Sequence, residues 1–518
     1  MNPTRFAFRQ LLTLVIVSIL FVGAKPAHAS ETDFSLGPEW REALSELRAL
    51  PVQDTGFVRT GHTFSENVLN AITGRSAAGD ASALETVLYL LRDPHRAHHA
   101  PLIRISRPEL IEIYGTSRIS AHTWRDMSYR DALLRFLHAD EETRMRPLNS
   151  IEYRAQLIEN LEGEFAIIPR NSDWLPPIAL RNATDISPAD QRIIDQWTAL
   201  RRALVQDDPE AGTVASRELV TAVNAAAEAQ NVELPRLGLD LFYHSHKPYR
   251  NAAAFYLFAS FFFAAGFFLA KQWLNWAGMA LLFIGLVEHS IGIGLRWALS
   301  GRAPVASMFE SFIFAVGGMV LLGLILDWFR YTRLAGLGAA ILGFIFMVIA
   351  HKAPIFDSQI RPLVPALQSS WLTYHVISYM LGYSAMALSF FAAALYLLKD
   401  MALGGDRGTS LLARRLPSLR TLDVFNYRAI AIGFPLITIG IVAGGVWAAT
   451  AWGRPWGFDP KETWSLITWL VYAIYLHVRY MAGWSGRSAA IIAIIGFLCV
   501  LFTYFGVNYL LPGLHSYV

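Results

Sequence analysis

The sequence predicts an all-α polytopic membrane protein, with about eight transmembrane helices preceded by a signal peptide and a mainly helical extracytoplasmic domain. Composition is the first reason, because 54% of the 518 residues are hydrophobic and only 16% are charged, whereas soluble domains carry about 25% charged residues. The second reason is a series of apolar runs after residue 249 that are long enough to cross a bilayer. The third is an apolar N-terminal run that is typical of exported proteins.

The composition also excludes several function classes. A formal net charge of +3 is too small for a typical nucleic-acid-binding protein, so no nucleic acid is expected as a partner. The single cysteine, Cys499, lies inside an apolar run and is expected to serve packing. One cysteine excludes an intrachain disulfide, a CxxC redox or zinc motif, and a CxxCH heme attachment site in this chain.

Residues 1–29 are predicted to be a signal peptide. Arg5 and Arg9 precede the apolar run LLTLVIVSILFVGA, and Ala27 and Ala29 then form an A-x-A cleavage pattern. The run is shorter than the roughly 20 residues that a membrane span needs, which favours cleavage after Ala29 over retention as an anchor.

Residues 30–248 carry most of the charge and contain amphipathic stretches such as ASALETVLYLLRD, which predicts one soluble, mainly helical domain. Within it, DPHRAHHAP places His95, His98 and His99 close together. A metal site is one interpretation of this segment. No acidic or cysteine partner stands at ligand spacing, so we expect these histidines to be solvated surface residues.

Residues 249–518 are predicted to form the membrane domain. Apolar runs of bilayer-spanning length predict eight spans, near 252–270, 273–294, 309–328, 334–351, 371–398, 429–447, 462–480 and 489–510. With the soluble domain outside, the inner excess of Lys and Arg comes mainly from the 399–428 loop. The predicted location is a bacterial inner membrane, with the soluble domain, the 447–469 region and the C-terminus on the periplasmic side. Asp327 then lies near the inner interface, where we expect it to be solvated.

The segment WGRPWGFDPKETW, residues 452–464, separates the sixth and seventh predicted spans. Asp459 is placed to cap a helix, with Pro460 in the first helical position and Glu462 able to reach back. A structural role is therefore available to both carboxylates, and Asp459 is also a candidate heme-binding residue.

The same region is unusually rich in aromatic residues. Trp447, Trp452, Trp456, Trp464 and Trp469 lie within 23 residues, together with Phe458 and the intervening glycines. An interfacial aromatic belt is one explanation. The density favours a flat shelf for a large, planar, apolar ligand such as heme. Arg454, Lys461 and the indole N–H groups can then hold acidic substituents at its rim.

Non-covalent heme needs axial ligands, most simply two histidines. His375 and His515 are predicted on the outer side with the tryptophan-rich segment, whereas His477 lies at the inner end of the seventh span. His289 lies in the outer half of the second span beside Glu288. A lone neutral histidine in a span proves little, so it is the pairing of His375 with His515 that favours heme.

At these residues the sequence resembles the CcsA (ResC) family of cytochrome c assembly proteins, which belong to the heme-handling group named for its WWD domain. The family segment W-G-x-x-W-x-W-D-P-K-E-x-W stands here as WGRPWGFDPKETW, with Phe458 replacing the third tryptophan. An aromatic face remains at that position, but an indole N–H is lost.

Four elements in order carry the resemblance over about residues 249–518. LRWALSGRAPVASMFESFIF resembles an external element, and SLITWLVYAIYLHVRY resembles the segment of a membrane histidine, here His477. LVPALQSSWLTYHV and YFGVNYLLPGLHSYV resemble the segments of two external histidines, here His375 and His515. FVRTGHTFSENVLNAITGR, residues 57–75, and LDLFYHSHKPYRNAAAFYL, residues 239–257, look distantly like the external segment before the CcsA half in longer, fused versions.

The resemblance implies a system II cytochrome c synthase that exports heme and attaches it to the CxxCH motif of an exported apocytochrome c. Heme b, bound non-covalently by two histidines, is substrate as well as ligand. It is expected to enter near His477 and to dock on the shelf between His375 and His515, where ligation protects ferrous iron. Thioether bonds then form with the apocytochrome thiols, and no side chain of this chain acts as nucleophile.

The family's membrane heme site takes a second histidine from a partner, so a separate CcsB/ResB-like membrane subunit is expected. His289 is the alternative source of that ligand, although a structural role suits it better. Arg296 and Glu310 are expected to pair and anchor an external loop, with binding of heme propionates as the alternative. Two rival functions stay open, namely heme delivery by a WWD-group protein without ligase activity and transport of another amphipathic solute.

Overall fold

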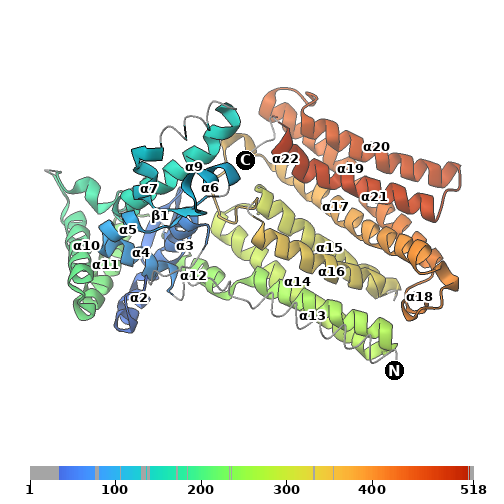
Figure 1. The fold of residues 1–518 in the computed structure, drawn as a ribbon, viewed down its shortest axis with the longest axis horizontal. Coiled ribbons are helices and arrows are strands. Elements are labelled where there is room, and N and C mark those ends of the chain that lie inside the picture. Colours follow the sequence, from blue (N-terminus) through green and yellow to red (C-terminus); the bar gives the residue numbers. More distant parts are fainter. Residues whose placement is uncertain are drawn as a thin grey trace. The chain divides into compact units, whose positions relative to one another are not determined.

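The computed structural model describes residues 34–511 and 513, apart from 76–80, 106, 130–132, 134–135, 137–140, 171–172, 184, 233, 235, 331–332 and 354. The chain divides into two compact units, Met1–His246 and Lys247–Val518 (Figure 1). The predicted signal peptide and His515 lie outside the described residues.

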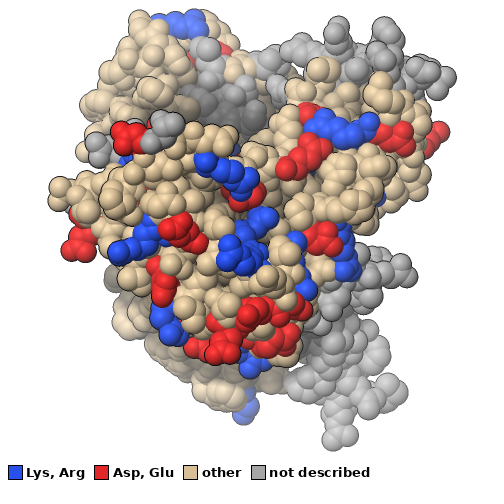
Figure 2. Space-filling view, turned by 90° about the vertical axis from the view of Figure 1, so that its left-hand side faces the viewer, with Lys and Arg blue, Asp and Glu red and all other residues tan. Residues whose placement is uncertain are grey.

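The first unit is mainly helical. Two short antiparallel hairpins accompany its helices: β1 (Pro51–Asp54) pairs with β2 (Phe57–Thr60), and β3 (Ile103–Arg104) pairs with β4 (Arg118–Ile119). The helices are α2 (Arg41–Leu47), α3 (Gly61–Thr73), α4 (Ala83–Arg92), α5 (Pro94–His99), α6 (Pro108–Tyr114), α7 (Ala121–Arg125), α9 (Glu141–Glu159), α10 (Pro188–Gln206), α11 (Pro209–Ala229) and α12 (Leu237–His246). On the face drawn in Figure 2, acidic and basic side chains are interspersed.

Helix caps and one buried tryptophan stabilise the packing of the helices in the first unit. Ser82 and Glu85 form a capping box at the start of α4. Trp40 is buried, and its indole N–H donates to Asp207 at the end of α10 over 3.1 Å. A side chain at Gly212 would collide with the Trp40 ring, so α11 can pack here only because that residue is glycine.

A buried polar network joins the two segments that resemble fused family members. Asp240 of α12 accepts hydrogen bonds from the Thr60 hydroxyl over 2.9 Å and from Arg59 over 3.3 Å. His244 Nδ1 lies 2.9 Å from Glu66 of α3. The end of the first unit is therefore tied to the β2–α3 connection, which lies about 180 residues earlier.

The second unit is a bundle of long helices (Figure 1). They are α13 (Pro248–Leu269), α14 (Gln272–Ser300), α15 (Met308–Arg330), α16 (Leu334–Lys352), α17 (Ser370–Leu397), α19 (Leu419–Trp452), α20 (Pro460–Met481) and α21 (Arg487–Leu501). A π-helical stretch extends α17 to Ala402, a second one (Phe502–Gly506) and α22 (Val507–Leu510) continue α21, and the short α18 (Leu411–Arg415) lies between α17 and α19. All eight predicted spans are helices.

Within the described ranges, seven helical segments are long and apolar enough to cross a membrane, one fewer than predicted. The exception is α20, whose sequence mixes Thr, Tyr, Trp and charged residues with its apolar ones. Its contacts show its direction. Arg479 binds Asp423 and Trp469 binds Thr438 of α19, whereas Thr468 binds Thr503 and Lys461 binds Asn508 on the α21–α22 side.

Helix α20 therefore runs antiparallel to both α19 and the α21–α22 segment. If those two cross a membrane in one direction, α20 must return between them. The eighth crossing thus stays a prediction from connectivity, while length and composition alone support seven.

The predicted pairing of Arg296 with Glu310 is confirmed. Arg296 Nη2 lies 3.0 Å and Arg302 Nη1 lies 2.7 Å from the Glu310 carboxylate, and both Arg296 and Glu310 are fully buried. Glu310 also accepts the backbone N–H groups of Ala306 and Ser307, and Arg296 donates to the Ser358 carbonyl over 2.8 Å. The pair thus anchors the α14–α15 loop and the segment after α16.

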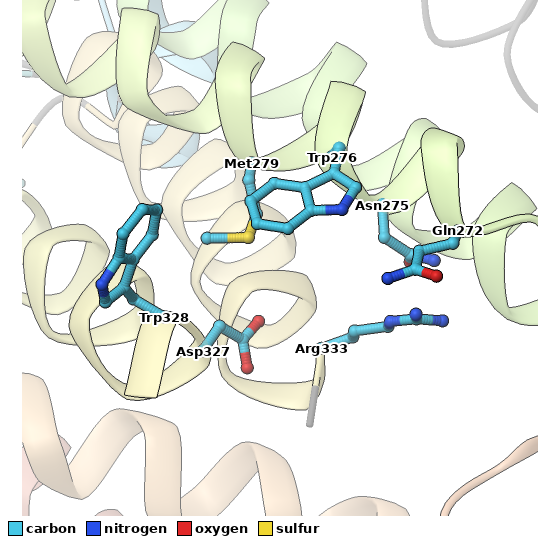
Figure 3. Close-up of a pocket in the computed structure, with 7 residues that line it drawn as sticks. All are labelled: Gln272, Asn275, Trp276, Met279, Asp327, Trp328 and Arg333. Carbon is cyan, nitrogen blue, oxygen red and sulfur yellow. The ribbon is translucent and has the colours of Figure 1, made fainter. Parts of the chain in front are cut away.

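The expectation that Asp327 is solvated is wrong. Its side chain is buried and accepts the N–H groups of Ala335 (3.3 Å) and Gly336 (2.7 Å), so Asp327 caps α16 from the preceding helix. Arg333, the residue before α16, provides no side-chain cap of its own. Figure 3 shows Asp327 beside Trp328 and Met279 in a small pocket between α14 and α15. The need to satisfy a helix N-terminus explains its burial.

We expect Glu310→Ala to destabilise the protein by about 3–5 kcal/mol, because it leaves the buried Arg296 guanidinium without its counter-charge. Thermal unfolding of the detergent-solubilised full chain would measure the change. The matched control is Asp357→Ala, which removes the ion pair between Asp357 and Arg361. Their side chains are 51% and 60% exposed, and an exposed pair of this kind stabilises a protein by less than about 1 kcal/mol. Equal small effects of both substitutions would contradict an anchoring role for Glu310.

Candidate functional site

His375 lies in the first turns of α17 and is oriented by α19. Its Nδ1 lies 2.6 Å from the Gly440 carbonyl oxygen. Because a carbonyl can only accept, Nδ1 carries the proton and donates, which leaves the lone pair of the neutral ring on Nε2. A backbone partner at one ring nitrogen is the usual support for a metal-binding histidine, since it fixes both tautomer and ring orientation.

Two glycines of α19 make room for this arrangement. A Cβ at Gly444 would lie 2.7 Å from His375 Nδ1, and one at Gly440 would lie 2.6 Å from the Tyr379 ring. Only glycine therefore lets the His375 ring reach the α19 backbone. Sequence reasoning missed both residues, although a G-x-x-x-G spacing in an apolar helix is a known sign of close helix approach.

Aromatic rings connect His375 to the tryptophan-rich segment. The Trp447 ring lies nearly parallel to the His375 ring, 14° apart in plane with centroids 6.4 Å apart. Trp452 then meets Trp447 edge-on at 4.8 Å. Trp447 is buried and donates its indole N–H to the Ala366 carbonyl. Its ring therefore packs against the His375 ring, while its N–H is bonded within the protein.

The predicted helix start at 459–462 is confirmed. Asp459 caps α20 with Pro460 in the first position, and Glu462 completes the capping box. Glu462 accepts the N–H groups of Gly457 over 2.7 Å and of Asp459 over 3.1 Å. The carboxylates thus have a structural role, and a role of Asp459 in heme binding stays a prediction.

Phe458, the departure from the family pattern, has an unusual conformation. Its φ of 55° is uncommon for an aromatic residue, and its side chain is 77% exposed. Trp456 meets the Phe458 ring edge-on at 6.2 Å. The segment next to the capping box therefore holds a bulky aromatic ring exposed at an unfavourable backbone angle, which is typical of a functional position.

Trp464 and Trp469 pack against neighbouring helices of the bundle. Trp464 contacts Phe502 with ring centroids 4.2 Å apart. Trp469 stacks on Phe434 at 5.2 Å and donates to Thr438 over 2.9 Å. These contacts assign both residues to the packing of α20. The prediction that Trp464 also binds heme stays untested.

His477 and His289 do not join this site. His477 is exposed on α20, two residues before Arg479, whose partner on α19 is Asp423. Asp423 lies roughly 25 Å along α19 from Gly440, the partner of His375. His289 is fully buried, its Nδ1 accepts from Tyr256 over 3.0 Å, and its Nε2 donates to the Ile313 carbonyl over 2.9 Å. Both ring nitrogens are thus used, which supports a structural role for His289 with partners other than Glu288.

His515 lies outside the described residues. Gly513, two residues before it in the sequence, lies close to Asp459, since a Cβ at Gly513 would be 2.6 Å from Asp459 Oδ1. The chain leading to His515 therefore passes the cap of α20.

The family model described as "Cytochrome C assembly protein" matches residues 305–515. The protein named cytochrome c biogenesis protein CcsA from Guillardia theta is 39% identical over 257 residues, which cover 46% of this chain and 85% of the relative. The chain belongs to the CcsA family.

Further CcsA proteins match to a similar extent. Those from Pyropia yezoensis and Synechococcus elongatus are 36% and 38% identical and are covered over 95% and 86% of their lengths. They match 49% and 46% of this chain. About half of the chain is thus CcsA-like, and the family match holds His375, His477 and the tryptophan-rich segment.

In this CcsA-family chain, we expect Glu462→Ala to loosen the segment before α20, because the Gly457 and Asp459 amides lose their acceptor. A cap of this kind is worth about 1 kcal/mol, which corresponds to roughly fivefold faster amide exchange. Hydrogen-exchange mass spectrometry on a peptide covering 453–461 would measure it. Glu462→Gln, which keeps a side-chain acceptor, is the control. Unchanged protection in the alanine variant would show that the segment is held by other contacts.

Proposed function

We propose that this chain exports heme and attaches it covalently to the CxxCH motif of an exported apocytochrome c, in a complex with a separate ResB-like membrane subunit. The observation that carries the proposal is the His375 ring, held by the Gly440 carbonyl in the tautomer that presents Nε2 as a ligand. It lies beside the Trp447–Trp452 pair in a chain of the CcsA family.

The described residues fit a large planar substrate with two acidic groups. His375 supplies an axial nitrogen, and its ring lies beside Trp447. Trp452, Trp456 and Phe458, in the segment that follows Trp447, supply aromatic surface. Arg454 is exposed, with its guanidinium against Gly457, and is the cation best placed for a propionate. Lys461 is less suited, because its ammonium group donates to Asn508 over 2.9 Å.

Heme supplies the chemistry through its two vinyl groups. Each apocytochrome thiol adds across one vinyl group, so that a carbon–sulfur bond forms, the thiol proton moves to the neighbouring carbon, and no net oxidation occurs. The chain's residues position the reactants. His375 and His515 hold the iron, the aromatic segment orients the ring plane, and the capping box fixes that segment.

The surface around His477 fits a ligand shared with another subunit. Leu466, Leu470, Ile474 and Met481 are exposed on α20 at spacings that place them in one stripe with His477. An exposed histidine inside an apolar stripe of a membrane helix requires a polar partner to offset its desolvation. We propose that a histidine of the ResB-like subunit approaches this stripe and that heme enters between the two.

In the first test, the full chain is purified with a ResB-like partner, and visible spectra are recorded before and after reduction. We expect sharp low-spin heme bands, which are lost or strongly weakened in His375→Ala combined with His515→Ala. Gly444→Ala should weaken the bands without removing a ligand, because its methyl group pushes the His375 ring off Gly440.

Gly294→Ala is the matched control, since a Cβ at that helical glycine meets nothing within 4 Å. Well-folded wild-type protein without heme would overturn the proposal. Heme binding without thioether formation, in an assay with a CxxCH peptide, would instead favour the rival function of heme delivery.

The second test addresses His477. We expect His477→Ala to reduce heme content at the inner site while leaving the spectrum of heme held by His375 intact, because His477 lies near the Asp423 end of α19, roughly 25 Å from the Gly440 carbonyl that holds His375. The partner subunit should still co-purify, since the apolar stripe remains. Unchanged total heme in this variant would exclude His477 as a ligand.

A further inference from the structure

Four histidines gather on the surface of the first unit. His95, His98 and His99 come from α5, and His122 comes from α7. His99 lies between two neighbours, with ring centroids 4.6 Å from His95 and 4.3 Å from His122. His98 lies 5.5 Å from His99 and 5.7 Å from His122. We call this group the histidine cluster.

These spacings lie near the ring-to-ring spacing of imidazoles around a metal ion. With zinc–nitrogen distances near 2.0–2.1 Å, two rings on one tetrahedral zinc ion have centroids about 5 Å apart. The three pairs formed by His98, His99 and His122 lie between 4.3 and 5.7 Å. His95 and His99 have the i, i+4 spacing that places two ligands on one helical face.

The backbone that carries the cluster is firmly held. Asp93 caps α5 by accepting the Arg96 N–H over 2.9 Å, and Ser120 caps α7 by accepting the Thr123 N–H over 2.9 Å. The rings themselves are accessible, since His95, His99 and His122 are exposed and His98 is 33% exposed. Among the described residues, no three His, Cys, Asp or Glu side chains are arranged to hold a metal ion, so binding requires these exposed rings to turn.

A carboxylate supports the cluster from one side. His98 Nε2 lies 3.5 Å from Glu159 at the end of α9. Glu159 is itself oriented by Arg125, which donates to it over 2.9 Å and also binds Glu152 over 2.8 Å. A carboxylate behind a histidine is the common second-shell arrangement of zinc-binding imidazoles.

We propose that the histidine cluster binds one divalent transition-metal ion through His98, His99 and His122, with His95 as the fourth ligand. Imidazole nitrogens suit Zn²⁺, Ni²⁺ and Cu²⁺, whereas Mg²⁺ and Ca²⁺ prefer oxygen ligands. The site is independent of the heme-binding residues, since all of its ligands lie in the first unit.

The test uses the full chain, purified through a tag without histidines and treated with a chelator. Isothermal titration with Zn²⁺ should show one ion per chain. Combined His99→Ala and His122→Ala should weaken binding roughly 100-fold or more, because two of the ligands are lost. His246→Ala, a histidine of the same unit outside the cluster, should leave the affinity unchanged.

Zinc-edge X-ray absorption on the loaded wild-type protein gives a second readout that does not depend on variants. It should show three or four imidazole ligands at about 2.0 Å. Absence of saturable binding, equal affinity in the double variant with unchanged circular dichroism, or a first shell dominated by oxygen would each overturn the proposal.

Discussion

The close approach of α17 and α19 is the constraint on which the site depends. Gly382 of α17 faces Gly433 and Ile437 of α19, where an added Cβ would lie 2.6 Å from the Ile437 side chain and 3.2 Å from the Gly433 carbonyl. One turn further along α19, Gly440 contacts Tyr379, and about one turn beyond it Gly444 contacts His375. Small residues on both helices let the two backbones meet, as is common in membrane bundles, where lipid is as apolar as the side chains it replaces.

The close approach of α17 and α19 also determines the hydrogen bonding of His375. It brings the Gly440 carbonyl within hydrogen-bonding distance of an imidazole, although that carbonyl also lies in a regular helix. The resulting bond sets the tautomer of His375 and turns its ring parallel to Trp447. A change in the helix spacing would therefore change the chemistry of the histidine as well as its position.

The sequence predicted the long helices well, because apolar runs of bilayer-spanning length leave few alternatives. It also predicted the start of α20, since Asp459, Pro460 and Glu462 act within a few residues of one another. Contacts between distant segments were harder. Asp327 was expected in solvent because it lies near the predicted inner interface, whereas in the structure it caps the following helix. The role of Gly440 depends on a residue of another helix and could not be read from its own surroundings.

The same distinction applies to the histidines. Their sequence positions alone did not separate ligands from structural residues, because a lone imidazole suits both roles. Hydrogen bonding distinguishes His289 from His375, the proposed ligand. His289 has a donor and an acceptor on its two ring nitrogens and is thereby fully occupied. The Nδ1 of His375 faces a carbonyl, which directs the ring's lone pair to Nε2. His122, separated from His99 by 22 intervening residues, completes a group that the DPHRAHHAP segment shows only in part. For His289 and His375, the expected role follows from which ring nitrogen carries the lone pair and from what lies opposite it, and only the packed fold defines both.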